Sequence, residues 1–123
     1  RIHDWLRRAF GALNVETELA PCCKKSLPGQ CFVGHEKFDL LWHGKKIAGA
    51  AQRRNKLGLL IQGSVQPPPL PLNRNEFEKA MCAVAEGDFS VNWTTFAPDA
   101  APHKDAVELA RQKYSQNDYN LRR

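Results

Sequence analysis

Apolar residues recur every three or four positions over residues 1–13, while arginines take the opposite side of the pattern. The apolar positions are Ile2, Trp5, Leu6, Ala9, Phe10 and Leu13. This spacing matches the period of an amphipathic helix, so we predict a helix over residues 1–13. Residues 15–20 (VETELA) instead alternate, with the two glutamates on one side, which predicts a half-exposed strand.

Three further strands are predicted in the middle of the chain. The candidates are residues 37–42 (KFDLLW), 45–53 (KKIAGAAQR) and 57–65 (LGLLIQGSV). His43 and Gly44 suit a tight two-residue turn between the first two strands, because glycine adopts a positive φ without steric cost. Residues 54–58 (RNKLG) predict a looser turn before the third strand. Short connections of this kind predict an antiparallel meander.

The remaining segments are predicted as two connections, two helices and an edge strand. Prolines in residues 21–30 and 66–73 indicate a loop and a stiff linker, although a Pro-x-x-Pro ligand of an SH3-type domain is an alternative for the second. Asn73 is a suitable N-cap for a helix that Gly87 is expected to end. An edge strand over residues 89–96 and a helix over residues 102–114 are expected to follow.

The composition is that of an ordinary globular domain. The 123 residues are 42% hydrophobic and 25% charged, which allows one domain at most and a core that needs no disulfide or metal. No apolar run reaches membrane-spanning length, and the amphipathic first residues are not a signal peptide. Because the chain begins at Arg1 inside a helical pattern, we expect a fragment, a processed chain, or a chain whose first part is absent.

The net charge of +5 indicates an anionic partner, either nucleic acid or an acidic protein. The basic residues are scattered in pairs and are not gathered into a stripe with interleaved aromatic residues, so nucleic-acid binding is the weaker interpretation. Such binding would show as retention on heparin or DNA with a steep salt dependence.

Four cysteines, Cys22, Cys23, Cys31 and Cys82, lack the spacing of a disulfide framework. Reduced thiols in a cytoplasmic protein explain them most simply. A zinc site from Cys22, Cys31 and His35 is an alternative, but no Cys-x-x-Cys pair occurs and we expect no metal. Cys31 is interpretable as a small buried hydrophobe, or as a nucleophile whose thiolate is favoured by nearby lysines.

Small residues follow two adjacent lysines in the strand predicted over residues 45–53. Strict alternation places Lys46 with Ala48, Ala50 and Gln52 on one face, and Lys45 with Ile47, Gly49 and Ala51 on the other. Small side chains leave space that another element or a ligand must fill. A lysine at the end of that space could stabilise negative charge on a ligand carbonyl oxygen. Ordinary strand-end lysines with ammonium groups in water are the alternative.

The segment FDLLWHGKKIAGAAQRRNKLGLLIQGSV resembles the central motif of the biotin/lipoate protein ligase superfamily. In that motif Asp, Gly-Lys-Lys-Ile, Gly-x-Ala-Gln and Leu-x-Gln-Gly-Ser recur in order. The segment IHDWLRRAFGALNVETELAP is similar to the family's middle helix and following strand, and KYSQNDYNLRR to its C-terminal helix and basic end. The resemblance implies an α/β fold, with a mixed, largely antiparallel sheet packed against helices. Residues 1–123 are then a single domain, or the C-terminal part of a larger catalytic domain whose N-terminal part is missing.

The resemblance also implies site residues in the lipoate branch of the superfamily. Lys46 matches the lysine that contacts the acyl carbonyl, and Cys31 matches the cysteine that forms an acyl thioester in octanoyltransferases. The residues implied to line the acyl chain or lie close to it are Gly49, Ala50, Gln52, Gly63 and Ser64. The activity implied is transfer of an octanoyl or lipoyl group from an acyl carrier protein, through Cys31, to a lysine of a lipoyl-domain or H-type carrier protein, without a cofactor.

Two departures from the family pattern keep alternatives open. Ile61 stands where the family often has histidine, and the family's Arg-Arg-x-x-Gly-Gly loop is absent. One alternative is an ATP-dependent lipoate-protein ligase, which would need ATP and Mg. Another is a non-catalytic split or degenerate relative that binds lipoyl domains, and a second chain supplying the N-terminal half is a further expected partner. Nucleic acid and membrane are not expected partners.

Overall fold

The computed structural model describes residues 1–25, 33–97 and 100–121, which fall into two compact units. The first unit is Arg1–Val91 and the second is Asn92–Arg123. Within the described residues, no helix is long and apolar enough to cross a membrane.

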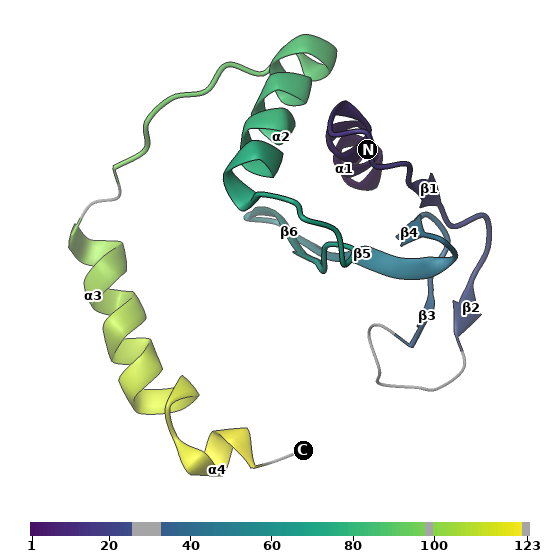
Figure 1. Ribbon diagram of the computed structural model, residues 1–123. Coiled ribbons are helices and arrows are strands. Elements are labelled where there is room, and N and C mark those ends of the chain that lie inside the picture. The colour runs from purple at the N-terminus through teal and green to yellow at the C-terminus, as the bar shows by residue number, and fades with distance from the viewer. Residues whose placement is uncertain (26–32, 98–99, 122–123) are drawn as a thin grey trace. The chain divides into compact units, whose positions relative to one another are not determined.

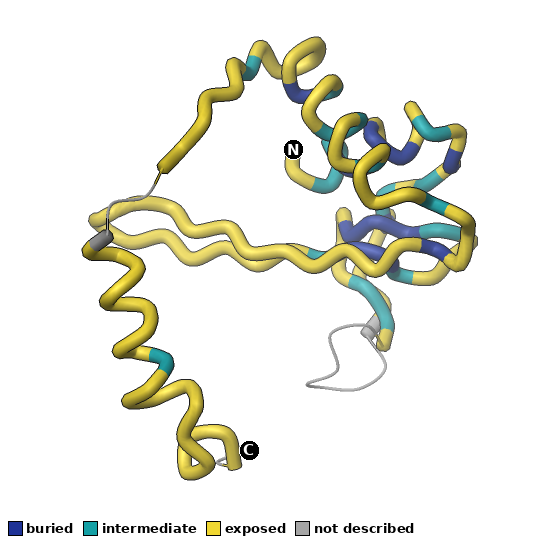
Figure 2. Tube along the Cα trace, turned by 60° about the vertical axis from the view of Figure 1, so that its left-hand side comes forward, coloured by how far each residue is buried: buried dark blue, intermediate teal, exposed yellow. Residues whose placement is uncertain are grey.

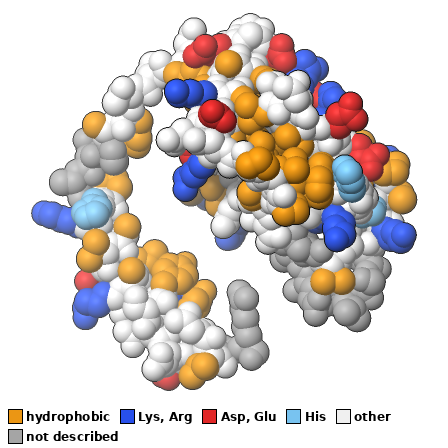
Figure 3. Space-filling view, in the orientation of Figure 1, with side chains coloured by type: hydrophobic (Ala, Val, Ile, Leu, Met, Phe, Trp, Pro, Cys, Tyr) orange, Lys and Arg blue, Asp and Glu red, His pale blue; other side chains and the backbone are white. Residues whose placement is uncertain are grey.

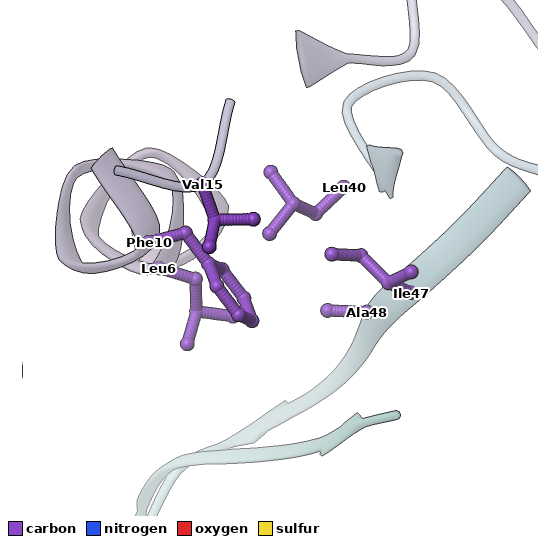
Figure 4. Close-up of a cluster of buried hydrophobic side chains, with 6 residues drawn as sticks. All are labelled: Leu6, Phe10, Val15, Leu40, Ile47 and Ala48. Carbon is purple, nitrogen blue, oxygen red and sulfur yellow. The ribbon is translucent and has the colours of Figure 1, made fainter. Parts of the chain in front are cut away.

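Helix α1 (Ile2–Ala12) confirms the first predicted helix and supplies one side of the core. Its apolar stripe buries Leu6, Ala9 and Phe10. Leu6 and Phe10 leave water together with Val15 and three residues of the sheet, Leu40, Ile47 and Ala48, as Figure 4 shows. Burial of apolar surface of this kind is the main favourable contribution to folding.

The sheet of the first unit has four antiparallel strands in the order β1-β4-β5-β6. The strands are β1 (Glu18–Leu19), β4 (Leu40–Trp42), β5 (Lys45–Asn55) and β6 (Gly58–Val65). Strands β4, β5 and β6 confirm the predicted meander, and β1 adds at its edge. The β5–β6 hairpin extends well beyond the buried part of the unit, and its outer portion is exposed along both strands (Figures 1 and 2).

Two turns hold the meander together. His43 (φ 48°) and Gly44 (φ 72°) form the predicted tight turn between β4 and β5. The second turn is tighter than predicted, because Asn55 pairs with Gly58 and only two residues separate them. Asn55 Oδ1 accepts hydrogen bonds from the backbone N–H groups of Leu57 (2.9 Å) and Gly58 (3.2 Å), and with this local cap β5 runs to Asn55, two residues further than predicted.

A second, small sheet corrects the loop predicted over residues 21–30. Strand β2 (Lys24–Lys25) pairs with β3 (Gly34–His35) in antiparallel register, Lys24 opposite His35. The prolines in this segment indicated a loop. A two-residue strand is too short to leave a periodic apolar and polar pattern that would have indicated otherwise. Residues 26–32, including Cys31, lie outside the described residues.

Helix α2 (Arg74–Phe89) covers the core from beside α1. Asn73 caps it as predicted, accepting the Asn75 N–H at 2.8 Å. Gly87 does not end the helix, which continues to Ser90 in the left-handed conformation (φ 53°). Contacts with α1 favour the continuation, since Arg8 Nη1 and Asp88 Oδ2 are 2.9 Å apart one residue beyond the glycine.

The edge strand predicted over residues 89–96, a stretch that spans the boundary between the units at Val91, is wrong. Phe89 belongs to α2, and residues 90–96 form no strand. A strand needs a neighbour for its backbone groups, and the described chain pairs none with this segment. Helix α3 (Ala100–Leu109) continues into the π-helical turn η1 (Ala110–Tyr114), which agrees with the predicted final helix, and α4 (Asn117–Asn120) follows.

Candidate functional site

Lys46, in β5, and Asp39, directly before β4, form a largely buried ion pair. Lys46 Nζ lies 2.7 Å from Asp39 Oδ2, and the side chains are only 11% and 6% exposed. The same carboxylate oxygen accepts the Glu36 backbone N–H at 2.8 Å. Charges are seldom buried unless they are paired and hydrogen-bonded, and this pair meets both conditions. The ammonium group is therefore held in one place and is not an ordinary strand-end lysine in water.

A β-bulge decides which face of the sheet Lys46 occupies. Leu41 pairs with Lys46 and Leu40 with Ala48, so Ile47 is one extra residue in β5. Both Ile47 and Ala48 are consequently buried in the core. Strict alternation placed Lys46 with Ala48, Ala50 and Gln52, and this prediction is wrong for Lys46. The bulge moves it to the face that carries Gly49.

Gly49 provides the space in which the Lys46 side chain lies. A Cβ atom added at Gly49 would be 2.6 Å from Lys46 Cε and 2.7 Å from Nζ, and 3.4 Å from Asp39 Oδ1. Distances below 3.0 Å are not compatible with packed atoms, so any larger residue here must displace the lysine. Gly49 thus has a structural role beside Lys46.

Ala50 and Gln52 contact a different space from Lys46. They line a hollow of about 470 Å³ on the helix side of the sheet, together with Ile2 and His3 of α1, Phe38 from the turn before β4, and Ile61 of the hairpin. At its wall, His3 Nδ1 donates to the Phe38 carbonyl at 2.6 Å. The five implied pocket residues are therefore not gathered in one place.

Gly63 and Ser64 lie next to the site through the register of the hairpin. Gly63 pairs with Ala50, and Ser64 pairs with Gly49. Directly paired residues of an antiparallel sheet share a face, which places Ser64 on the Lys46 face and Gly63 on the helix side. A Cβ at Gly63 would lie 3.2 Å from the Gly49 carbonyl oxygen, so the strands approach closely here.

Asp39 is the residue of this site that sequence reasoning missed. It stood in the segment on which the resemblance rests, but no role was given to it. The signal was its position two residues before Leu41, the partner of Lys46, since residues two apart in a strand share a face. The tight turn predicted at His43 and Gly44 already implies the pairing of Leu41 with Lys46, so this signal was present in the sequence.

The cysteines do not add a described nucleophile or metal site. Cys22, Cys23 and Cys82 are exposed. Cys31, which is also one ligand of the zinc site considered above, lies outside the described residues. Among the residues that the structure describes, no group of three His, Cys, Asp or Glu side chains could hold a metal ion.

Comparisons with known proteins identify the fold. No protein-family model and no curated protein matches the sequence. The structure resembles that of a protein from T. acidophilum provisionally named a lipoate protein ligase, solved with bound lipoic acid: the TM-score is 0.75, the sequence identity 15%, and the match covers 98% of this chain and 56% of that chain. A second structure with the same description, apart from the lipoic acid, matches with a TM-score of 0.74, the same 15% identity and the same coverage.

The comparison confirms the predicted fold class, a mixed α/β fold with an antiparallel sheet packed against helices. At this identity the likeness shows the fold alone. This chain spans little more than half the length of the T. acidophilum protein.

Proposed function

We propose that this chain carries acyl-transfer chemistry of lipoate metabolism, moving an octanoyl or lipoyl group onto a lysine of a lipoyl-domain or H-type carrier protein. One observation carries the proposal: a buried lysine, oriented by Asp39 and lying in the space left by Gly49, on a sheet whose fold resembles that of a protein solved with lipoic acid. A fixed ammonium group is suited to stabilising negative charge on an acyl oxygen, because it needs no reorganisation during the reaction.

The proposed mechanism has two acyl transfers with Cys31 as the nucleophile. The Cys31 thiolate attacks the carbonyl carbon of an acyl thioester, a new C–S bond forms, and the donor leaves as a thiolate that takes up a proton. The acceptor lysine amine then attacks the Cys31 thioester, the C–N bond forms, the amine loses a proton and Cys31 leaves as thiolate. In both steps Lys46 Nζ donates to the developing oxyanion.

An ATP-dependent ligase is the second candidate, and the provisional name of the T. acidophilum protein favours it. In that reaction the acyl group is activated as an adenylate with ATP and Mg, and Cys31 has no covalent role. Lys46 would still contact the acyl carbonyl. The two candidate reactions therefore use Lys46 in the same way, and they differ in whether Cys31 forms a covalent intermediate.

A mass-spectrometric experiment separates the candidates. The protein at its natural length is incubated with octanoyl-carrier thioester and a lipoyl domain, with and without ATP and Mg, and both proteins are weighed. The transferase predicts an octanoyl adduct that is lost on Cys31→Ser but kept on Cys82→Ser, an exposed cysteine elsewhere. If Cys31→Ser transfers octanoate from the thioester at the wild-type rate, the covalent mechanism is wrong.

Adjacent lysines give a matched control for the oxyanion role. Lys45 is exposed whereas Lys46 is buried against Asp39. Lys46→Met is expected to slow transfer by about 100-fold, the usual effect of removing one oxyanion donor, and Lys45→Met is expected to change it by less than about 3-fold. Equal rates for the two variants would contradict the role of Lys46 in either reaction.

The acceptor is proposed to be an acidic protein, which the net charge of +5 supports. Association with a lipoyl domain is then faster at low ionic strength, because salt screens the long-range attraction. Binding of the lipoyl domain with no turnover, in the protein at its natural length, would instead identify a non-catalytic relative.

A further inference from the structure

The β5–β6 hairpin carries positive charge with no acidic residue to balance it. No Asp or Glu stands between Asp39 and Glu76 in the sequence. Three cations, Arg53, Arg54 and Lys56, lie close together at the outer end of the hairpin, and all three are exposed (Figure 2). Within the described part of the chain, none of the three is paired with a carboxylate.

The arginines of the described helices, by contrast, are each neutralised by a carboxylate. The pairs are Arg7 and Arg8 with Asp4, Arg8 with Asp88, Arg74 with Glu78, and Arg111 with Glu108. Unpaired cations on a protruding element produce a local positive potential that attracts an acidic partner. The outer hairpin is therefore a surface on which the net charge of +5 can act on a partner.

The two arginines of the hairpin lie on opposite faces of it. The pairing of β5 with β6 has no bulge, and residues two apart in a strand share a face. Arg53 therefore lies on the same face as Gly49, and Arg54 lies on the helix side of the sheet. The Lys46 side chain lies against Gly49, so Arg53 is on the face that carries the ammonium group.

An exposed leucine accompanies each arginine. Arg53 pairs with Leu60 and Arg54 with Leu59, and the two leucines are 63% and 45% exposed. Paired residues share a face, so Leu60 lies beside Arg53 on the Lys46 face. Apolar side chains next to arginine are typical of protein interfaces, whereas nucleic-acid surfaces combine many cations with aromatic residues. The composition of this face therefore favours an acidic protein as the partner.

We propose that Arg53 and Leu60 form the docking surface for the acidic acceptor protein whose lysine receives the acyl group. The identity of this partner rests on the proposed function. The acceptor fits better than an acyl donor protein, because the transferase and the ligase both need an acceptor, whereas the ligase uses no carrier-bound donor.

The distance along the strand allows one domain to reach both the docking surface and the candidate site. From Gly49 to Arg53, four residues of extended strand span about 14 Å. A folded domain of about 100 residues has a radius of gyration of about 13 Å, so its width exceeds this separation. An acceptor domain that contacts Arg53 can therefore present its lysine beside Lys46 at the same time.

Single substitutions on the two faces test this docking surface in the protein at its natural length. Binding of a fluorescently labelled lipoyl domain with an unmodified lysine is measured by anisotropy, and KM and kcat for that domain are measured in the transfer reaction. Arg53→Gln and Leu60→Ser are each expected to raise Kd and KM by about 5- to 10-fold with kcat unchanged, as removal of a central contact does. The matched controls on the helix side, Arg54→Gln and Leu59→Ser, should change both constants by less than about 2-fold, since they lose only long-range attraction.

Unfolding temperatures check that the variants are folded. All four side chains are exposed, so the temperatures should equal that of the wild type.

Three outcomes overturn the docking surface. The first is a natural-length protein that does not bind the lipoyl domain. The second is an equal effect, or no effect, of Arg53→Gln and Arg54→Gln. The third is Arg53-dependent binding of heparin or anionic vesicles that exceeds binding of the lipoyl domain, which would assign the surface to another polyanion.

Failure of the proposed reaction gives a different result. Arg53-dependent binding of the lipoyl domain with no acyl transfer contradicts the reaction and supports the docking surface. Acyl transfer with the same KM in wild type and Arg53→Gln contradicts the docking surface alone.

Discussion

Three residues around Lys46 decide what it can do. Asp39 pairs with its ammonium group, Gly49 leaves room for its side chain, and the extra residue Ile47 turns it away from the core. None of the three needs to contact a substrate for the lysine to depend on it. Substitutions at these positions therefore test the effect of moving the ammonium group, whereas substitution of Lys46 tests the effect of removing it.

Gly49→Ala is expected to displace the Lys46 side chain and leave the fold intact. The new methyl group would meet the flexible end of the lysine, 2.6 Å from Cε. We expect a stability loss of about 1 kcal/mol by urea denaturation and transfer at least about 10-fold slower. Gly87→Ala adds the same methyl group inside α2 with no atom within 4 Å, and should gain about 0.5–1 kcal/mol with unchanged transfer. If Gly49→Ala transfers the acyl group at the wild-type rate, the space that Gly49 leaves for the Lys46 side chain is not needed for transfer.

Asp39→Asn is expected to destabilise the protein by about 3 kcal/mol, because it leaves the largely buried Lys46 ammonium without its carboxylate. Thermal or urea unfolding measures the loss. The double variant Asp39→Asn with Lys46→Met should recover most of it, since no unpaired charge then remains. A single-variant cost below about 1 kcal/mol would mean that the pair is not buried in solution as it is in the structure.

At the scale of elements, contacts between α1 and α2 determine where α2 ends, which the local sequence pattern did not. Phe10 and Phe77 stack with ring centroids 4.5 Å apart, and Trp5 Nε1 donates to the Met81 carbonyl at 2.8 Å. Arg8 bridges Asp4 on its own helix and Asp88 on α2. These contacts extend past Gly87, which is why the helix does not end where glycine indicated.

The lowered pKa of Asp4 gives the stability of α1 a dependence on pH. The hydrogen bond from Arg7, followed by one from Arg8, lowers the pKa of Asp4 below its ordinary value of 3.8, although burial opposes the shift. A carboxylate with a lowered pKa contributes stability above the ordinary value, and that contribution disappears as the pH falls through the lowered pKa. Because the Asp4 side chain is 30% exposed, the contribution should stay within about 1 kcal/mol.

Asp4→Asn should therefore flatten the dependence of unfolding temperature on pH in the acidic range below 3.8. Differential scanning calorimetry of wild type and variant measures this. Arg7→Met, which removes the first cause of the shift, should flatten the profile in the same direction. A variant profile parallel to the wild type at every pH would refute the assignment to Asp4.

At the scale of the whole molecule, every residue of the core cluster lies in the first unit. The cluster and the partly buried residues against it extend from Leu6 to Met81, and the unit ends at Val91. In Figure 3 the orange hydrophobic side chains that gather between helix and sheet belong to this unit. The first unit therefore has its own hydrophobic core, which is what a domain needs in order to fold alone.

A chain cut after Val91 is expected to fold as the first unit does within the whole. Its ¹H–¹⁵N correlation spectrum should overlay that of the full chain for α1 and the sheet. A control chain cut after Leu72 loses α2, including Phe77 and Met81, which pack against the core, and should lose dispersed signals. Collapse of the spectrum in the longer fragment would contradict the division at Val91.

Much of the architecture could be predicted because it is encoded locally. The periodic apolar residues of α1, the turn at His43 and Gly44, the cap at Asn73 and the meander all depend on residues close together in the chain. The strand predicted at residues 89–96 failed because a strand also needs a partner, and the apolar and polar pattern does not show whether one exists.

The sequence by itself determined most of the elements, and its resemblance to a known superfamily supplied the fold class and the selection of Lys46. Only the tertiary structure decided that Lys46 shares a face with Gly49, that Asp39 is its partner, and that Ala50 and Gln52 contact a different space. The physical reason is the bulge at Ile47. One extra residue reverses the alternation of a strand, and it becomes visible only when β5 is paired with β4, because a register belongs to two strands and not to one.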